Sequence, residues 1–184
     1  KHGGANIKVQ QMMKDLKKHV KDTSDVDEIV FYLNQLLNKE AFDKKGLIYG
    51  MGHAVYTLSD PRAVILKRKA FEMAKGKEIE AEFQLLSLVE ELTPILMKEV
   101  RGVDKAMCAN VDMYSGLVYA MLGIPEEVFT PLFASARIAG WCANRMEEVL
   151  TGNRIMRPAY RAVTIRNHYL PMDKREAHME LPEA

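Results

Sequence analysis

Apolar residues recur at helical spacing along most of the chain. Val9, Met12 and Leu16 share one face of the segment 5–20 and lysines occupy the other face, which predicts an amphipathic helix. Alternating strand patterns are scarce, and Leu47-Ile48-Tyr49 is the best short candidate. The pattern therefore predicts an all-α fold. The same periodicity predicts further helices from Ser24 to about Leu37, from Asp60 to about Ala74, and over 78–100, 104–122 and 130–150.

Capping residues, prolines and glycines mark the expected helix boundaries. The segment 24–27 resembles a capping box, and Asp60-Pro61 places an N-cap before a proline at the first helical position. Thr130-Pro131 repeats that arrangement, so we expect a helix to begin there. Pro94 predicts a kink or a break within its helix. After Gly152 the sequence predicts a mostly extended tail.

Composition excludes several classes of protein. The chain has 184 residues, of which 48% are apolar and 28% charged, so it can build a packed core. Its net charge of +1 argues against nucleic-acid binding through bulk electrostatics. No apolar run approaches the roughly 20 residues that span a bilayer, and no secretory signal is visible, so we expect a cytoplasmic protein without a membrane partner. Cys108 and Cys142 do not form a disulfide framework.

The chain begins with Lys1 and continues directly into His2-Gly3-Gly4-Ala5-Asn6. A histidine followed by two glycines is an unusual way to open a domain. We therefore expect that the chain was processed or cut from a longer protein.

Arg137 lies on an apolar helical face, with Phe133, Ala134 and Trp141 at helical spacing around it. A guanidinium keeps its charge, so burial on such a face would require an anion. That anion could come from a ligand. An internal carboxylate, or a side chain that extends to solvent, would fit the spacing as well.

Asp112 lies in a largely apolar run that includes Cys108, Ala109 and Gly116. A poorly solvated carboxylate has a raised pKa, which suits a general base. The alternative is that Asp112 caps the helix that follows it.

Two histidines stand next to glycines, which allow the backbone to approach a ligand closely. His53 follows Gly50-Met51-Gly52, and His2 precedes Gly3. Each could be a functional or a purely structural residue. The sequence contains no metal-ligand spacing, P-loop, dinucleotide fingerprint or Gly-x-Ser-x-Gly motif, so we expect neither a metal nor a tightly bound cofactor.

In order along the chain, these features resemble the citrate synthase family. The five blocks that carry the resemblance are His2-Gly3-Gly4-Ala5-Asn6, Gly50 to Tyr56 with Asp60-Pro61-Arg62, Asn110-Val111-Asp112 with Tyr114-Ser115-Gly116, Phe129 to Phe133 with Arg137 and Gly140-Trp141, and Arg154-Ile155 with Arg157-Pro158. The resemblance implies an all-α enzyme that works as a homodimer. Residues 1–117 would form the family's small domain, and residues 118–184 the C-terminal helices of its large domain.

The resemblance implies an acyltransferase of the tricarboxylic acid cycle that condenses acetyl-CoA with oxaloacetate and water to citrate and CoA. Asp112 would remove a proton from the acetyl methyl group. His2 would stabilise the enol at the thioester oxygen, and His53 would polarise the ketone of oxaloacetate. A base paired with an acid at the oxygen where charge develops fits this chemistry, because the methyl proton is a very weak acid.

Substrate binding follows from the same resemblance. Arg62, Arg137 and Arg157 would hold the two carboxylates of oxaloacetate, and Arg157 would reach in from the other subunit. The glycine loop formed by Leu47, Ile48, Tyr49, Gly50, Met51 and Gly52 would lie against the CoA adenine.

The chain departs from the family pattern at Thr57, where many members carry a cation for a CoA phosphate, and at Ala54 and Asn144. Two other functions remain open. The first is 2-methylcitrate synthesis from propionyl-CoA, because one methylene changes pocket affinity by only about 1–3 kcal/mol. The second is a non-catalytic fragment that serves as an assembly module.

Overall fold

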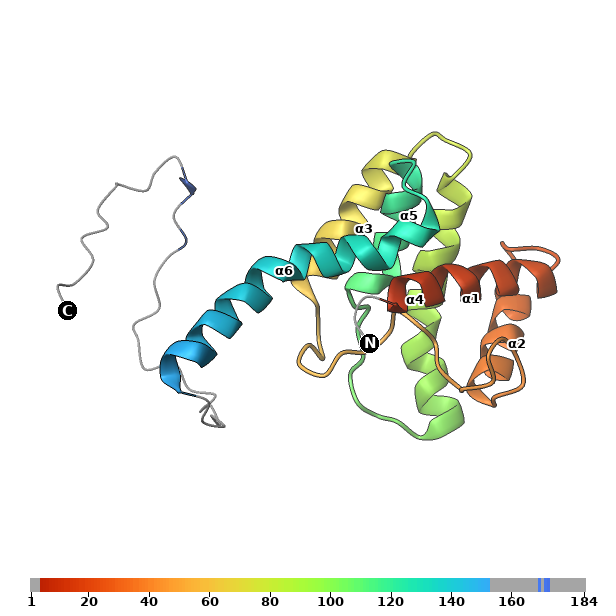
Figure 1. Ribbon diagram of the computed structural model, residues 1–184. Helices are drawn as coiled ribbons and strands as arrows, with labels where there is room; N and C mark the ends of the chain where they lie inside the picture. The colour runs from red at the N-terminus through yellow and green to blue at the C-terminus, as the bar shows by residue number, and fades with distance from the viewer. Residues whose placement is uncertain (1–3, 153–168, 170, 173–184) are drawn as a thin grey trace. The chain divides into compact units, whose positions relative to one another are not determined.

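The computed structural model describes residues 4–152, 169, 171 and 172 (Figure 1). Its helices are α1 (Ala5–His19), α2 (Val26–Leu37), α3 (Pro61–Ala74), α4 (Glu80–Arg101), α5 (Val111–Met121) and α6 (Glu126–Thr151). Residues 4–152 contain one isolated antiparallel bridge, between Met51 and Ala109, and no longer strand. The all-α prediction is therefore confirmed, and the strand expected at Leu47-Ile48-Tyr49 is wrong.

The chain divides into two compact units, Lys1–Cys142 and Ala143–Ala184. The boundary predicted at residue 117 between two domains stays a prediction. The extended tail predicted after Gly152 lies outside the described residues, apart from three isolated positions.

Two of the expected helix starts follow the local chemistry of their caps. Asp60 accepts a hydrogen bond from the Arg62 N–H and precedes Pro61, as predicted for α3. At α2 the cap is Asp25 rather than Ser24: its carboxylate accepts from the N–H groups of Asp27 and Glu28. The expected start was therefore one residue early.

The predicted starts of α5 and α6 differ from the structure by several residues. The last helix begins at Glu126 and not at Thr130, so Pro131 lies inside it. Glu126 and Glu127 carry negative charge in the first turn, where the helix dipole favours it, and this explains the earlier start. The helix expected over 104–122 forms only from Val111, where Asn110 caps it.

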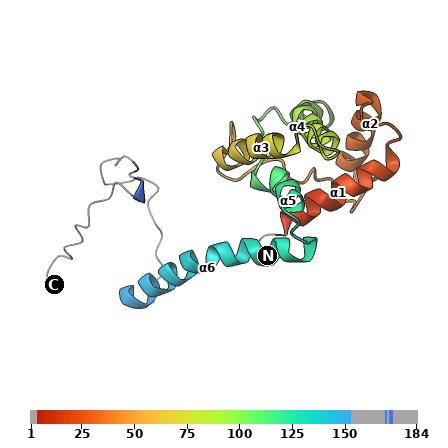
Figure 2. The ribbon, with the colours of Figure 1, turned by 90° about the horizontal axis from the view of Figure 1, so that it is seen from above.

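Helix α5 lies at the centre of the core of the first unit. It packs against α3, α1 and α4, and Figure 2 shows α3 and α1 on either side of it. Gly116 of α5 allows this close contact, since an added Cβ would lie 2.6 Å from Nε2 of the buried Gln10 on α1. The fully buried apolar side chains of this core include Val9, Met12, Leu16, Ile29, Leu33, Leu86, Val89 and Met113.

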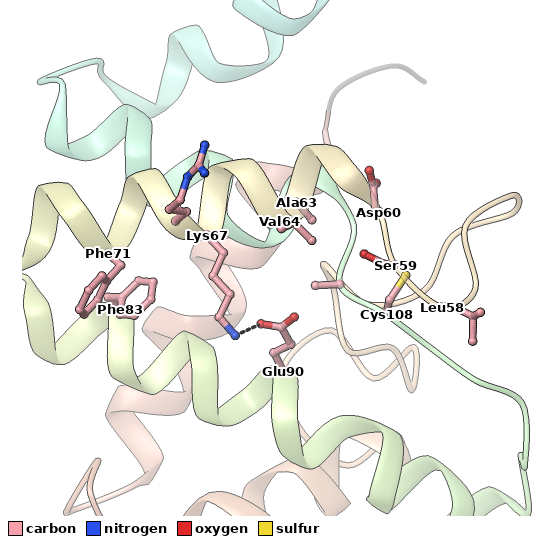
Figure 3. A pocket seen from close by; sticks show the side chains of 12 residues that line it. Leu58, Ser59, Asp60, Ala63, Val64, Lys67, Phe71, Phe83, Glu90 and Cys108 are labelled. Carbon is pink, nitrogen blue, oxygen red and sulfur yellow. Dashed lines mark hydrogen bonds and ion pairs between the residues drawn. The ribbon is translucent and has the colours of Figure 1, made fainter. Parts of the chain in front are cut away.

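A partly buried polar network joins α3, α4 and α5. The Glu90 carboxylate of α4 accepts hydrogen bonds from the Tyr114 hydroxyl of α5 and, at 2.7 Å, from Lys67 Nζ of α3 (Figure 3). Tyr114 is fully buried, and burial raises the pKa of its hydroxyl, which keeps it protonated as a donor. The network therefore links α3 and α4 to the N-terminal part of α5.

Gly50 allows the loop before α3 to pack closely against the core. Its φ of +88° is left-handed, and an added Cβ would lie 2.9 Å from Met113 Cα and 3.0 Å from Val9 Cγ2. Both the backbone conformation and the space therefore require glycine here.

We predict that Gly50→Ala destabilises the chain by about 2 kcal/mol more than Gly76→Ala. Gly76 has a similar φ of +71° but nothing within 4 Å of an added Cβ, so its variant carries the conformational cost alone. Urea denaturation of both variants measures the difference. Equal destabilisation of the two variants would show that the close contact with Met113 adds no cost to the Gly50 substitution.

Candidate functional site

Two segments that are far apart in sequence pair beside the first turn of α5. The Gly52 N–H donates to the Cys108 carbonyl, and the Asn110 N–H donates to the Gly50 carbonyl, each at 2.8 Å. These bonds enclose the Met51–Ala109 bridge. The pairing brings the loop that carries His53 next to the start of the helix that carries Asp112.

The hydrogen bonds of His53 define its tautomer. Its Nδ1 accepts from the N–H groups of Val55 and Tyr56, at 3.1 and 3.2 Å. Because Nδ1 accepts, the proton of the neutral ring is on Nε2. Arg62 Nη2 lies 3.3 Å from Nε2. Two N–H donors at this separation can share one acceptor oxygen placed between them.

The guanidinium of Arg62 is held by Asp60. Its Nε and Nη2 donate to the two carboxylate oxygens of Asp60 at 3.0 and 2.8 Å, and its Cζ lies 5.3 Å from the ring centre of Tyr56. Asp60 is 1% exposed, and the hydrogen bond from Arg62 lowers the pKa of its carboxyl. Arg62 is itself exposed, so its remaining donors are open to a ligand.

Asp112 is the second residue of α5, and it is not the cap. Asn110 Oδ1 accepts from the Asp112 N–H at 3.0 Å, so the alternative role considered for Asp112 is wrong. Its Oδ1 is buried and has no hydrogen-bond partner among the described residues. Burial raises the pKa of the Asp112 carboxyl, while Arg62, Arg137 and, to a smaller extent, His53 oppose that rise. The carboxylate is thus desolvated, with two arginines and a histidine nearby.

Arg137 differs from its expected setting. The residue is exposed, and its guanidinium lies 4.7 Å from the ring centre of Phe133. Neighbouring Trp141 is 43% exposed, so the apolar face around Arg137 is not buried within the described chain. The premise that this arginine is buried was therefore wrong. Its charge nevertheless contributes to the field at Asp112.

The glycine loop is fixed at both ends. Arg101 Nη2 donates to the carbonyls of Gly46 and Leu37, each at 2.6 Å, and the pairing at Gly50 and Gly52 holds the other end. Ile48 is 7% exposed and packs inward, whereas Leu47 is 49% exposed. Within the loop, Tyr49 donates its hydroxyl to Asp43 at 2.7 Å, and Met51 is half-buried.

Several cavities adjoin these residues. One, of about 90 Å³, is lined by His53, Thr57, Lys105 and Met107, among others. Another, of about 390 Å³, lies between α3 and α4 and is lined by Asp60, Lys67, Glu90 and apolar side chains (Figure 3). Cys108 also lines this second cavity.

Several residues with a role in this geometry were missed in the sequence. Asp60 was recognised as a cap but not as the partner of Arg62, although its spacing two residues before an arginine was a usable signal. Lys105 was missed altogether, because only the fold brings it to the cavity beside Thr57. His2 and Arg157, both predicted site residues, lie outside the described residues.

Two absences are established for the described residues. No group of three or more His, Cys, Asp or Glu side chains among them could hold a metal ion. None of their helices is long and apolar enough to cross a membrane.

The described site groups a desolvated carboxylate, two arginines and a histidine on an all-helical scaffold. Residues 1–159 match the family model described as citrate synthase, C-terminal domain. The chain belongs to the citrate synthase family.

Individual relatives agree with this assignment. The chain is 33% identical to citrate synthase of Haloferax volcanii over 95% of its own length and 41% of the relative, and 37% identical to that of Synechocystis over 95% and 40%. The crystal structure of the Thermotoga maritima enzyme matches with a TM-score of 0.62 at 32% identity, covering 95% of this chain and 43% of that one.

A citrate synthase of Thermoplasma acidophilum, solved as a ternary complex with carboxymethyl coenzyme A and oxaloacetate, matches with a TM-score of 0.63 at 26% identity. That match covers 94% of this chain and 42% of the other. The chain spans about two fifths of the length of the curated relatives it matches.

We predict that Asp112→Asn stabilises the chain by roughly 1 kcal/mol at neutral pH, because it removes a buried charge whose Oδ1 has no partner among the described residues. The raised pKa means that the folded chain binds the Asp112 proton more tightly than the unfolded chain does. The gain should therefore grow as the pH rises above the ordinary value of 3.8, and disappear below it.

Asp27→Asn is the matched control. Asp27 is also the second residue of its helix, and its N–H also donates to the cap, but its side chain is exposed. That variant should be neutral or slightly destabilising. Urea denaturation above and below pH 3.8 compares the two. The same response in both would contradict a special environment at Asp112.

Proposed function

We propose that the chain forms the C-terminal part of a citrate synthase that condenses acetyl-CoA with oxaloacetate. The observation that carries this proposal is the Asp112 carboxylate, with its buried Oδ1 and its position near Arg62, Arg137 and His53. A desolvated carboxylate with a raised pKa is a stronger base than an exposed one, and it can take a proton from the weakly acidic acetyl methyl group.

His53 and Arg62 are suited to the second reactant. The Nε2–H of His53 and the nearby Nη2 of Arg62 can both donate to an oxygen of oxaloacetate. Hydrogen bonds to the ketone oxygen withdraw charge from the ketone carbon, which the enol carbon then attacks. The new carbon–carbon bond gives citryl-CoA, and water hydrolyses its thioester to citrate and CoA.

CoA binding is proposed along the glycine loop and the cavity beside His53. The loop from Leu47 to Gly52 is fixed by Arg101 at one end and by the pairing with residues 108–110 at the other. Lys105 lines the cavity together with Thr57. A lysine here can supply the cation that Thr57 lacks for a CoA phosphate.

The remaining parts of the proposal rest on the resemblance. His2 would stabilise the enol, and Arg157 would complete the oxaloacetate site from the partner subunit of a homodimer. A cytoplasmic location also belongs to this proposal. The Thermoplasma acidophilum relative, which was solved with carboxymethyl coenzyme A and oxaloacetate, supports both substrates.

We predict that Asp112→Asn in the complete enzyme lowers kcat by roughly 10²–10⁴-fold with little change in oxaloacetate affinity. The Asn side chain keeps the size but cannot accept the methyl proton. A direct test follows exchange of the acetyl methyl protons with solvent deuterium, in the presence of an oxaloacetate analogue that cannot condense. The wild-type enzyme should catalyse exchange and the Asn variant should not.

His53→Ala is the control for that experiment, because polarising the ketone matters only for the later carbon–carbon step. It should keep proton exchange while losing condensation. Exchange at the wild-type rate in Asp112→Asn would place the base elsewhere. Absence of citrate formation by the wild-type enzyme, with acetyl-CoA and propionyl-CoA tested in parallel, would overturn the proposed function itself.

We predict that Arg137→Leu raises the KM for oxaloacetate by about 10–10²-fold, the loss expected for charge-assisted hydrogen bonds to a carboxylate. The fold should be unaffected, since Arg137 is exposed and forms no ion pair among the described residues. Arg68→Leu, at another exposed arginine, is the control. A lowered melting temperature with unchanged KM would instead assign Arg137 a structural role.

A further inference from the structure

The side chain of Asn110 bridges the two segments that carry the proposed catalytic groups. Its Oδ1 accepts from the Asp112 N–H at 3.0 Å, and its Nδ2 donates to the Gly52 carbonyl at 2.8 Å. Its own N–H donates to the Gly50 carbonyl at 2.8 Å. One residue therefore bonds the amide of Asp112 and the residue directly before His53.

We propose that Asn110 is a positioning residue that sets His53 and Asp112 relative to one another. This inference rests on the proposed function, in which Asp112 removes a proton and His53 polarises the ketone that the resulting carbon attacks. The two steps act on neighbouring atoms, so both groups must be held in register. A misplacement of about 1 Å can cost roughly 10²-fold in rate.

The two side-chain hydrogen bonds of Asn110 use both the oxygen and the nitrogen of its carboxamide. Capping α5 requires only an acceptor, and Ser, Asp or Thr would supply one. The bond to the Gly52 carbonyl additionally requires a donor on the same side chain, at the reach of Nδ2. Asn therefore does more here than a helix cap requires, and the two functions can be separated by substitution.

Asn110→Ser keeps a capping oxygen but is too short to reach the Gly52 carbonyl. Asn110→Asp keeps the size and the capping acceptor, but it brings a carboxylate against that carbonyl. Both variants should lower kcat of the complete enzyme by about 10–10²-fold. The KM for oxaloacetate should rise by a smaller factor than kcat falls, because the arginines proposed to bind its carboxylates are untouched.

The pH profile distinguishes the two variants. A second negative charge beside Asp112 raises its pKa further, so more protons must be removed before the base can act. Asn110→Asp should therefore move the acid limb of the kcat/KM profile to higher pH. Asn110→Ser adds no charge and should leave that limb closer to the wild-type position.

Asp25→Ser is the matched control. Asp25 caps α2 by accepting from the N–H groups of Asp27 and Glu28, and it belongs to no part of the proposed site. It should show the stability change of a cap-to-serine substitution with unchanged kcat. Wild-type kcat and pH profile in both Asn110 variants, or an equal loss of kcat in Asp25→Ser, would overturn the proposal.

Hydrogen exchange tests the positioning role without any assay of activity. The Gly52 amide donates to the Cys108 carbonyl within the pairing that Asn110 closes. Asn110→Ser should speed exchange of that amide by tenfold or more relative to amides of α2, on the order of a 1.4 kcal/mol loss of protection. Unchanged Gly52 exchange would overturn the proposal, whereas an inactive wild-type enzyme would overturn the proposed function alone.

Discussion

The antiparallel pairing of residues 50–52 with residues 108–110 is the interaction on which the candidate site depends. It joins segments almost sixty positions apart, and its two backbone hydrogen bonds are short and direct. Gly50 lets the loop lie against Met113 and Val9, so the pairing is also anchored in the core. This pairing holds Asp112, on the first turn of α5, close to His53, on the loop before α3.

The site contains two aspartates whose environments push their pKa values in opposite directions. Asp60 is buried but accepts two hydrogen bonds from the guanidinium of Arg62, which lowers the pKa of the Asp60 carboxyl. Asp112 is partly buried with one unpartnered oxygen, and desolvation raises its pKa. Opposite shifts of this kind keep Asp60 charged beside Arg62, and they give the Asp112 carboxylate the higher affinity for a proton, as the proposed general base requires.

Local sequence signals predicted part of this arrangement and missed the rest for identifiable reasons. Asp60-Pro61 predicts the start of α3, because an N-cap residue and a proline at the first helical position both favour a helix within its first turn. The start at Thr130-Pro131 failed, since a proline is also tolerated within a helix whose first turn is already favoured by acidic residues. The order of the family blocks pointed to Asp112 and His53, whereas the bridging side chain of Asn110 depends on contacts that no spacing reveals.

The charges of the described site set a specific requirement for binding the proposed dianionic substrate. Asp60 and Asp112 offset Arg62 and Arg137, and Nδ1 of His53 accepts a hydrogen bond from the Val55 N–H. Oxaloacetate, the substrate proposed for this site, would bring two further negative charges into this balanced group. Desolvating a dianion without added positive charge is costly, so a complete site needs at least one further cation. Arg157 is the residue of this sequence that the resemblance assigns to that role, and an arginine contributed by a second subunit would make substrate binding and subunit association depend on each other.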